Sequence, residues 1–186
     1  ELKRISREEG CLRLGACLTY AELIRSDIPG ILREVFSTVA SPAVRSRGTI
    51  GGNICNASPA GDTLPMLYAL GAYVELARAD GLGMAIRRVV PVKEFIRGVR
   101  KISRRYNELL TAVLIPLENL DGGNYFYFKK VGARRSEAVS KLSVFGMART
   151  AGGKILRADI AMGAVGPVVV TSKDSAGIWT GLSKER

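Results

Sequence analysis

The chain of 186 residues has no histidine and only three cysteines. Without histidine it cannot build a Ser-His-Asp or Cys-His catalytic centre, or a zinc site that depends on imidazole. The cysteines Cys11, Cys17 and Cys55 have no C-x-x-C spacing, so they do not form an iron–sulfur or zinc cluster by themselves. Their odd number fits reduced thiols in a cytosolic protein, and we therefore expect a cytoplasmic location.

Long apolar runs and aromatic side chains are also scarce. No run approaches the length of about 20 residues that a membrane-crossing helix needs, so we expect no membrane span. Aromatic residues make up 6% of the chain, which is few for a surface that stacks nucleobases. No nucleic-acid-binding motif accompanies the net charge of +11, so we expect no nucleic acid partner. A solvated basic surface is the first interpretation, with an acidic protein or an anionic cofactor as alternatives.

The most informative segment runs from residue 48 to residue 62. The paired glycines Gly51 and Gly52 let backbone N–H groups approach a ligand with no side chain in the way. Successive N–H groups in such a turn form a partly positive concavity that suits a phosphate. Short polar side chains that can hold the turn or reach ribose and phosphate oxygens flank the pair: Thr49, Asn53, Asn56, Ser58 and Asp62. Neither G-x-x-x-x-G-K-[ST] nor a G-x-G-x-x-G that opens a helix is present.

The whole string T-I-G-G-N-I-x-N-A-S-P-A-x-D, at residues 49–62, is far more specific than its glycine pair. It resembles the second flavin-binding loop of the FAD-binding (medium) subunits of molybdenum hydroxylases, the xanthine dehydrogenase and carbon monoxide dehydrogenase family. Further stretches extend the resemblance over nearly the whole chain: 12–16, 19–23, 59–65, 108–116, 128–132 and 139–144. The resemblance implies an α+β protein, with an FAD-binding domain of the vanillyl-alcohol-oxidase (PCMH) type followed by a small α+β domain.

The resemblance also implies how the chain is divided. We assign residues 1–117 to the second lobe of the FAD-binding domain and residues 124–186 to the C-terminal domain, because a polar stretch with Gly122 and Gly123 separates them. Family members begin with an earlier lobe whose glycine-rich loop cradles the FAD pyrophosphate. This chain begins past that lobe and stops near Leu182, before the helical end of the family, so we expect a fragment.

In that family the flavin subunit carries electrons between other subunits. The resemblance implies a [2Fe–2S] iron–sulfur subunit as donor, a large molybdopterin-binding subunit that oxidises the substrate, and NAD⁺ or another acceptor that takes electrons from FAD. Because the flavin does the redox chemistry, we predict no catalytic side chain and no metal ligand in this chain. We also predict that FAD is bound without a covalent link, because no histidine is available for attachment.

The resemblance assigns roles to single residues. The amides of residues 50–53 are predicted to face the FAD phosphates, with side-chain hydrogen bonds from Thr49 and Asn53. Asp62 is predicted to contact the nucleotide half or brace the loop, and an N-cap role is equally open. Leu110 is predicted to touch FAD by packing, and Lys130 to place positive charge near the flavin unless it is a surface lysine. The predicted cofactor-binding residues are Thr49, Ile50, Gly51, Gly52, Asn53, Asp62, Leu110 and Lys130.

Apolar spacing and turn signals predict the secondary structure. Thr19 followed by Glu22 predicts a capping box at the start of a helix. A second helix is predicted from residue 31 to 39, ending at Pro42, and a third follows Asp62. The aromatic run 125–128 is predicted to pack at the domain interface. Strands are predicted at residues 12–18, 73–78, 84–90, 108–115, 125–128, 141–149 and 155–163.

Two other functions stay open at this level. One is a flavin reductase of cell-wall precursor synthesis, of the UDP-N-acetylenolpyruvoylglucosamine reductase type, which has a related fold and a similar glycine–asparagine loop. The S-P-A-x-D string and the region of Lys130 and Lys141 favour the hydroxylase family. The other is a non-catalytic basic interaction module that has lost FAD binding, because the expected first lobe is missing.

Overall fold

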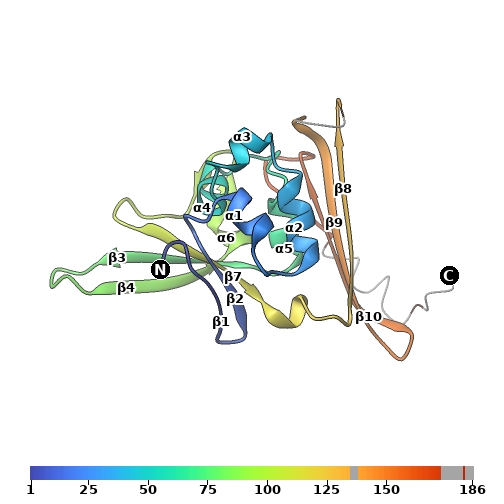
Figure 1. The fold of residues 1–186 in the computed structure, drawn as a ribbon, viewed down its shortest axis with the longest axis horizontal. Coiled ribbons are helices and arrows are strands. Elements are labelled where there is room, and N and C mark those ends of the chain that lie inside the picture. Colours follow the sequence, from blue (N-terminus) through green and yellow to red (C-terminus); the bar gives the residue numbers. More distant parts are fainter. Residues whose placement is uncertain (135–137, 173–181, 183–186) are drawn as a thin grey trace.

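The computed structural model describes residues 1–134, 138–172 and 182. A five-stranded antiparallel sheet carries the helices on one of its faces, and a second sheet stands beside the helices α2 and α5 (Figure 1). Buried residues from both sheets and from the helices form one hydrophobic core. The helices therefore lie between the two sheets.

The first sheet has the strand order β1-β2-β7-β3-β4. In β3, Val74 and Leu76 are buried beneath the helices, whereas Glu75 points to the opposite face. The predicted turn at Asp80 joins β3 to β4. It is stabilised by the Asp80 carboxylate, which accepts hydrogen bonds from the amides of Leu82 and Met84. The strands are β1 (Ile5–Glu8), β2 (Cys11–Gly15), β3 (Tyr73–Ala79), β4 (Ala85–Pro91) and β7 (Leu109–Pro116).

Short helices connect these strands. The predicted capping box is confirmed: the Glu22 amide donates to Thr19 Oγ1 and the Thr19 amide donates to the Glu22 carboxylate. The prediction that Pro42 ends a helix was wrong, since Pro42 begins α3 with Ser41 as its cap; the first helical turn needs no amide donor from proline. The helices are α1 (Tyr20–Arg25), α2 (Gly30–Ser37), α3 (Pro42–Arg45), α4 (Ile50–Asn56), α5 (Leu64–Ala69) and α6 (Val92–Phe95). Among the described residues, no helix is long and apolar enough to cross a bilayer.

The second sheet has the strand order β11-β10-β9-β8. The predicted hairpin at residues 151–153 joins β9 to β10, with both glycines at positive φ. The aromatic run on β8 packs at the interface only in part, because alternation buries Phe126 and Phe128 partly and leaves Tyr125 and Tyr127 exposed. The strands are β8 (Asn124–Gly132), β9 (Ser140–Ala151), β10 (Lys154–Gly163) and β11 (Val170–Thr171). A helical part of the C-terminal region, which the predicted α+β class required, is absent from residues 124–134 and 138–172.

The small remaining elements are β5 (Ile96–Gly98), β6 (Lys101–Ile102) and the 3₁₀ turn η1 (Leu117–Asn119). Between the sheets, α5 packs on β9 and β10. The approach is so close at Gly163 that a Cβ atom there would lie 2.9 Å from Pro65 Cγ. Next to it, the Ala164 amide donates to the carbonyl of Pro59 at 2.9 Å. The residue that follows β10 therefore contacts the N-A-S-P-A-x-D string directly, at the backbone.

Candidate functional site

The glycine pair lies in a helix, and not in the loop that we predicted. Thr49 caps α4, because its Oγ1 atom accepts a hydrogen bond from the Gly52 amide at 3.1 Å. Glycine and asparagine are poor helix formers, so propensity alone opposes this helix. Packing on β7 and close contact with the chain after β2 hold it in place.

The amides of residues 50–53 do not form a free concavity for phosphate, which corrects the predicted mechanism. Each of them donates a hydrogen bond within the chain at 3.0 to 3.1 Å. The acceptors are Leu18 O for Ile50, Ala16 O for Gly51, Thr49 Oγ1 for Gly52 and Thr49 O for Asn53. A hydrogen-bonded amide gains little from a second acceptor. These amides are therefore occupied within the chain, and contact of residues 50–53 with FAD stays a prediction.

The two glycines have different roles in this helix. Gly51 is buried, and a Cβ atom on it would lie 2.7 Å from the Cβ atom of Ala16. Gly52 is exposed, and a Cβ atom there would crowd only Thr49 Oγ1, at 3.0 Å. Packing explains the glycine at position 51, whereas position 52 presents bare backbone to the surface.

Asn53 is linked to the next part of the predicted site through Thr63. The Thr63 hydroxyl donates to Asn53 Oδ1 at 2.7 Å, and Thr63 is fully buried. Asn53 is half-buried, and its Nδ2 atom donates to none of the described residues while remaining open to solvent. Thr63 could not be predicted from the sequence, because no spacing rule joins it to Asn53.

Asp62 does not cap a helix. Thr63 occupies the N-cap position of α5, and the Asp62 carboxylate instead accepts from Lys130 Nζ at 2.7 Å and from Ser140 Oγ. Lys130 also donates to the carbonyl of Thr38 at 2.9 Å. The two predicted residues thus form one ion pair, with side chains only 9% and 15% exposed. Lys130 is therefore not a surface lysine, and Asp62 compensates its charge.

Leu110 lies on β7 and is part of the hydrophobic core, with 5% of its surface exposed. Its neighbour Thr111 accepts at its carbonyl from the Ala16 amide, and the Ala16 carbonyl accepts from the Gly51 amide. This chain of contacts joins β7 to the start of α4. A role of Leu110 in contact with FAD stays a prediction.

A cavity of about 520 Å³ opens beside Lys130, between α2, α3 and β8. Arg45 lines it, and its guanidinium is held by the carbonyls of Val39 and Ala40 at 2.7 and 2.8 Å. Arg45, Lys129 and Arg134 give its wall a basic character, whereas Glu34 is acidic and the charge of Lys130 is already paired with Asp62.

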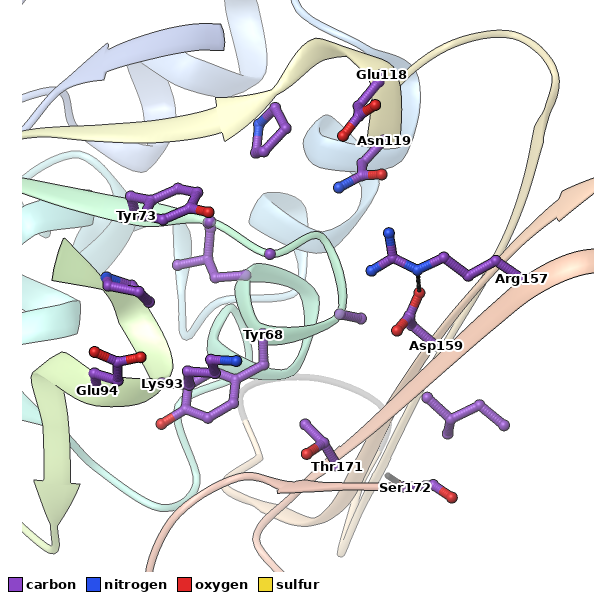
Figure 2. Close-up of a pocket in the computed structure, with 17 residues that line it drawn as sticks. Tyr68, Tyr73, Lys93, Glu94, Glu118, Asn119, Arg157, Asp159, Thr171 and Ser172 are labelled. Carbon is purple, nitrogen blue, oxygen red and sulfur yellow. Dashed lines mark ion pairs between the residues drawn. The ribbon is translucent and has the colours of Figure 1, made fainter. Parts of the chain in front are cut away.

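A second cavity, of about 450 Å³, lies at the other end of α5, where β10 and β11 face the first sheet (Figure 2). The Arg157 guanidinium pairs with Asp159 at 2.6 Å on its wall. The Tyr68 hydroxyl is buried there without a hydrogen-bond partner among the described residues, and burial raises the pKa of Tyr68 to about 12. Basic and acidic groups are mixed around it, so its charge favours no single kind of ligand.

Comparison with known proteins identifies the family. The family model described as the FAD binding domain in molybdopterin dehydrogenase matches residues 1–118. The chain belongs to this family. The predicted relationship to the molybdenum hydroxylases, the FAD cofactor and the oxidoreductase class are thereby confirmed. Of the two flavoenzymes considered from the sequence, the match selects the molybdopterin dehydrogenase type.

Relatives of this FAD-binding domain support the same conclusion. The carbon monoxide dehydrogenase medium chain of Afipia carboxidovorans is 30% identical over 188 residues, which is 97% of this chain and 62% of the relative. The xanthine dehydrogenase FAD-binding subunit of Escherichia coli O157:H7 is 27% identical, over 91% of this chain and 58% of the relative. The structure of carbon monoxide dehydrogenase from Hydrogenophaga pseudoflava superimposes with a TM-score of 0.87 at 25% identity, over 98% and 62% of the two chains. The chain thus spans about three fifths of the length of these relatives.

Proposed function

We propose that this chain is the flavin subunit, or part of it, of a molybdenum-containing hydroxylase in the cytoplasm. It takes electrons from a [2Fe–2S] iron–sulfur subunit and passes them through FAD to NAD⁺ or another acceptor, while a large molybdopterin-binding subunit oxidises the substrate. The observation that carries the proposal is the family match over residues 1–118, which contains all predicted cofactor-binding residues except Lys130.

The residues around α4 are suited to hold a dinucleotide. Bare backbone at Gly52 allows close approach of a diphosphate, and the open Nδ2 atom of Asn53 supplies a hydrogen-bond donor. When bound, FAD supplies the redox chemistry, and the protein supplies position and electrostatics. Asp62 and Lys130 hold the second sheet next to this surface, and no side chain has to act as acid or base.

We further propose that residues 1–117 are the second lobe of a PCMH-type FAD-binding domain and that residues 124–186 belong to a C-terminal domain. The position of the two sheets supports this division, since β7 ends at Pro116 and β8 begins at Asn124. The end of the family match at residue 118 also supports it.

Titration of the chain with FAD, followed by quenching of flavin fluorescence, tests the binding part of the proposal. We expect saturable quenching, and affinity about tenfold weaker in Asn53→Asp, which replaces the donor by a carboxylate. Asn124→Asp, on β8 away from α4, is the matched control and should bind FAD like the wild type. A folded chain that does not quench flavin at all would instead support the interaction module.

Electron transfer requires the assembled enzyme. The chain is co-purified with its iron–sulfur and molybdopterin subunits, and substrate is added without air. We expect the visible absorbance of the flavin to bleach, and to return when NAD⁺ or another acceptor is supplied. Flavin that stays oxidised while the iron–sulfur clusters become reduced would contradict the proposed electron path.

A further inference from the structure

Thr63 has an unusual position for a threonine at the start of a helix. Threonine at an N-cap normally accepts a hydrogen bond from a helix amide, which stabilises the helix by about 1 kcal/mol. Thr19, Ser41 and Thr49 all do so at their own helices. Thr63 occupies the N-cap of α5 and makes no such bond. Its hydroxyl donates instead to Asn53, ten residues earlier in the chain.

This direction of donation determines how the Asn53 amide is oriented. A carboxamide has one oxygen acceptor and one nitrogen with two donors. A hydroxyl that donates fixes the oxygen, so the nitrogen is the end of the amide that is left for another acceptor. A free asparagine would present either end at similar cost.

We propose that Thr63 is a positioning residue, which holds the oxygen of the Asn53 amide and so leaves its nitrogen for FAD. The idea rests on the proposed flavin-binding function. It explains why the Thr63 hydroxyl bonds to Asn53 and not to an amide of its own helix. It also means that the Asn53 amide has the same orientation, with its nitrogen as the available donor, in every molecule.

FAD affinity of substituted chains is the first test. Thr63→Val keeps the shape and removes the hydroxyl, so FAD should bind about fivefold to tenfold more weakly. Thr63→Ser restores the hydroxyl and should lie within about twofold of the wild type. Thr171→Val, on the short strand β11, is the matched control and should bind FAD like the wild type. In an Asn53→Ala background, Thr63→Val should have no further effect, because the two residues act through one contact.

The orientation of the amide is measured without cofactor by NMR. The side-chain NH₂ resonances of Asn53, assigned by their loss in Asn53→Ala, should be sharp and distinct from those of a free asparagine. Thr63→Val should move them towards free values, and Thr63→Ser should not. If Thr63→Val leaves them unchanged in a chain that still folds, the proposal is overturned.

The two measurements separate this inference from the proposed function. A wild-type chain that binds no FAD contradicts the flavin-binding function. It also contradicts the role of the Asn53 side-chain amide as a donor to FAD, whatever the NMR shows. A wild-type chain that binds FAD, while Thr63→Val binds equally well, leaves the function intact and removes Thr63 from it. If Thr63→Val does not fold, Thr63→Ala replaces it, and the same movement of the Asn53 resonances is expected.

Discussion

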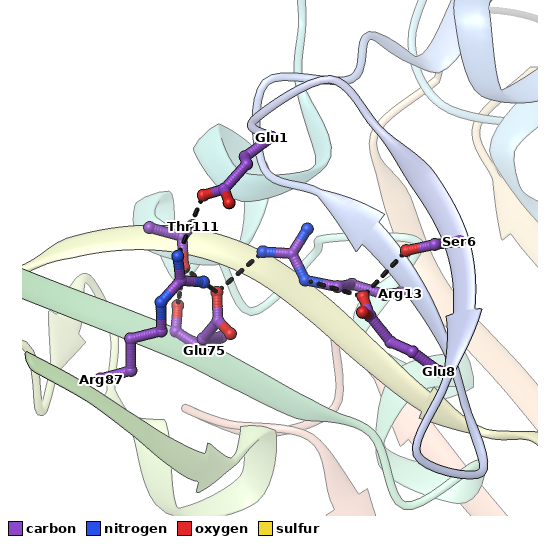
Figure 3. Close-up of polar contacts among 7 residues, drawn as sticks. All are labelled: Glu1, Ser6, Glu8, Arg13, Glu75, Arg87 and Thr111. Carbon is purple, nitrogen blue, oxygen red and sulfur yellow. Dashed lines mark hydrogen bonds and ion pairs between the residues drawn. The ribbon is translucent and has the colours of Figure 1, made fainter. Parts of the chain in front are cut away.

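The carboxylates of Asp62 and Glu75 are both little exposed and paired with basic side chains, yet they connect different parts of the protein. Asp62 pairs with Lys130, 68 residues later, and so ties the segment before α5 to β8 of the second sheet. Glu75 lies on the face of the first sheet that is turned away from the helices, and its partners all come from that same sheet (Figure 3). Burial of a charge alone therefore does not reveal what the charge is for.

The Glu75 cluster connects four neighbouring strands. Arg13 on β2 donates to Glu75 Oε1 at 2.8 Å, Arg87 on β4 donates to it at 3.1 Å, and the Thr111 hydroxyl on β7 donates to the same oxygen. Arg87 also reaches Glu1 at 3.0 Å. This cluster stabilises the sheet on the side away from the predicted cofactor surface, whereas the Asp62 pair lies next to that surface.

Removing Asp62 should have the largest effect. In Asp62→Ala, the Lys130 ammonium stays almost buried without its carboxylate, and we expect a loss of about 3 kcal/mol in the free energy of unfolding. FAD affinity should fall too, because the second sheet is no longer held beside α4. Urea denaturation and FAD titration measure the two effects. The double variant Asp62→Ala/Lys130→Met should regain part of the stability, and a double variant as unstable as the single one would contradict this account.

Glu75→Ala tests the second region of the comparison, the cluster on the outer face of the first sheet. It leaves Arg13, whose side chain is 8% exposed, without its main partner, and we expect a loss of about 2 kcal/mol in stability. FAD affinity should not change, because the cluster lies on the opposite face of the sheet. A clear loss of FAD affinity in a variant that is still folded would show that the two regions are coupled.

Glu108 adds a dependence on pH to the first sheet. Hydrogen bonds from Arg88 at 2.6 and 2.8 Å, together with the Arg105 amide, lower the pKa of Glu108 from its ordinary 4.5 to about 2. A lowered pKa in the folded state stabilises the protein fully above the ordinary value, and the stabilisation is lost as pH falls towards 2. The stability difference between wild type and Glu108→Gln should therefore be greatest near neutral pH and shrink between pH 4.5 and 2. Thermal unfolding at several pH values measures it.

Gly52→Ala should change stability least. The added methyl group meets only Thr49 Oγ1, at 3.0 Å, and alanine favours helix, so we expect a change within about 0.5 kcal/mol. FAD binding should nevertheless weaken, because the methyl group covers bare backbone. Gly51→Ala is the matched control: its Cβ atom would press on Ala16, and it should lower the melting temperature clearly. Equal FAD affinity in wild type and Gly52→Ala would contradict the proposed contact surface.

Local signals in the sequence predicted local structure well. The capping box at Thr19 and the turn at Asp80 each depend on residues within a few positions, and both are confirmed. The two hairpins and the strand β7 follow from apolar alternation and turn residues in the same way. Such signals need no knowledge of the rest of the chain.

The parts that depend on distant contacts could not be predicted. Helix α4 contains residues that disfavour helix, and it is held by contacts with distant residues, among them the close fit of Gly51 against Ala16. Asp62 and Lys130 were both predicted to belong to the site, but no spacing rule indicates that they pair with one another. Thr63 and Ser140 were not predicted at all, because their role comes from the hydrogen bonds that they make across the fold.

The contact at Gly163 has a consequence for how the two sheets are joined. A Cβ atom at position 163 would lie 2.6 Å from Ser143 Oγ and 2.9 Å from Pro65 Cγ, so glycine lets β10 come this near to α5. A larger residue at this position would push the second sheet away from the segment that carries Asp62, and the ion pair with Lys130 would have to stretch to follow it.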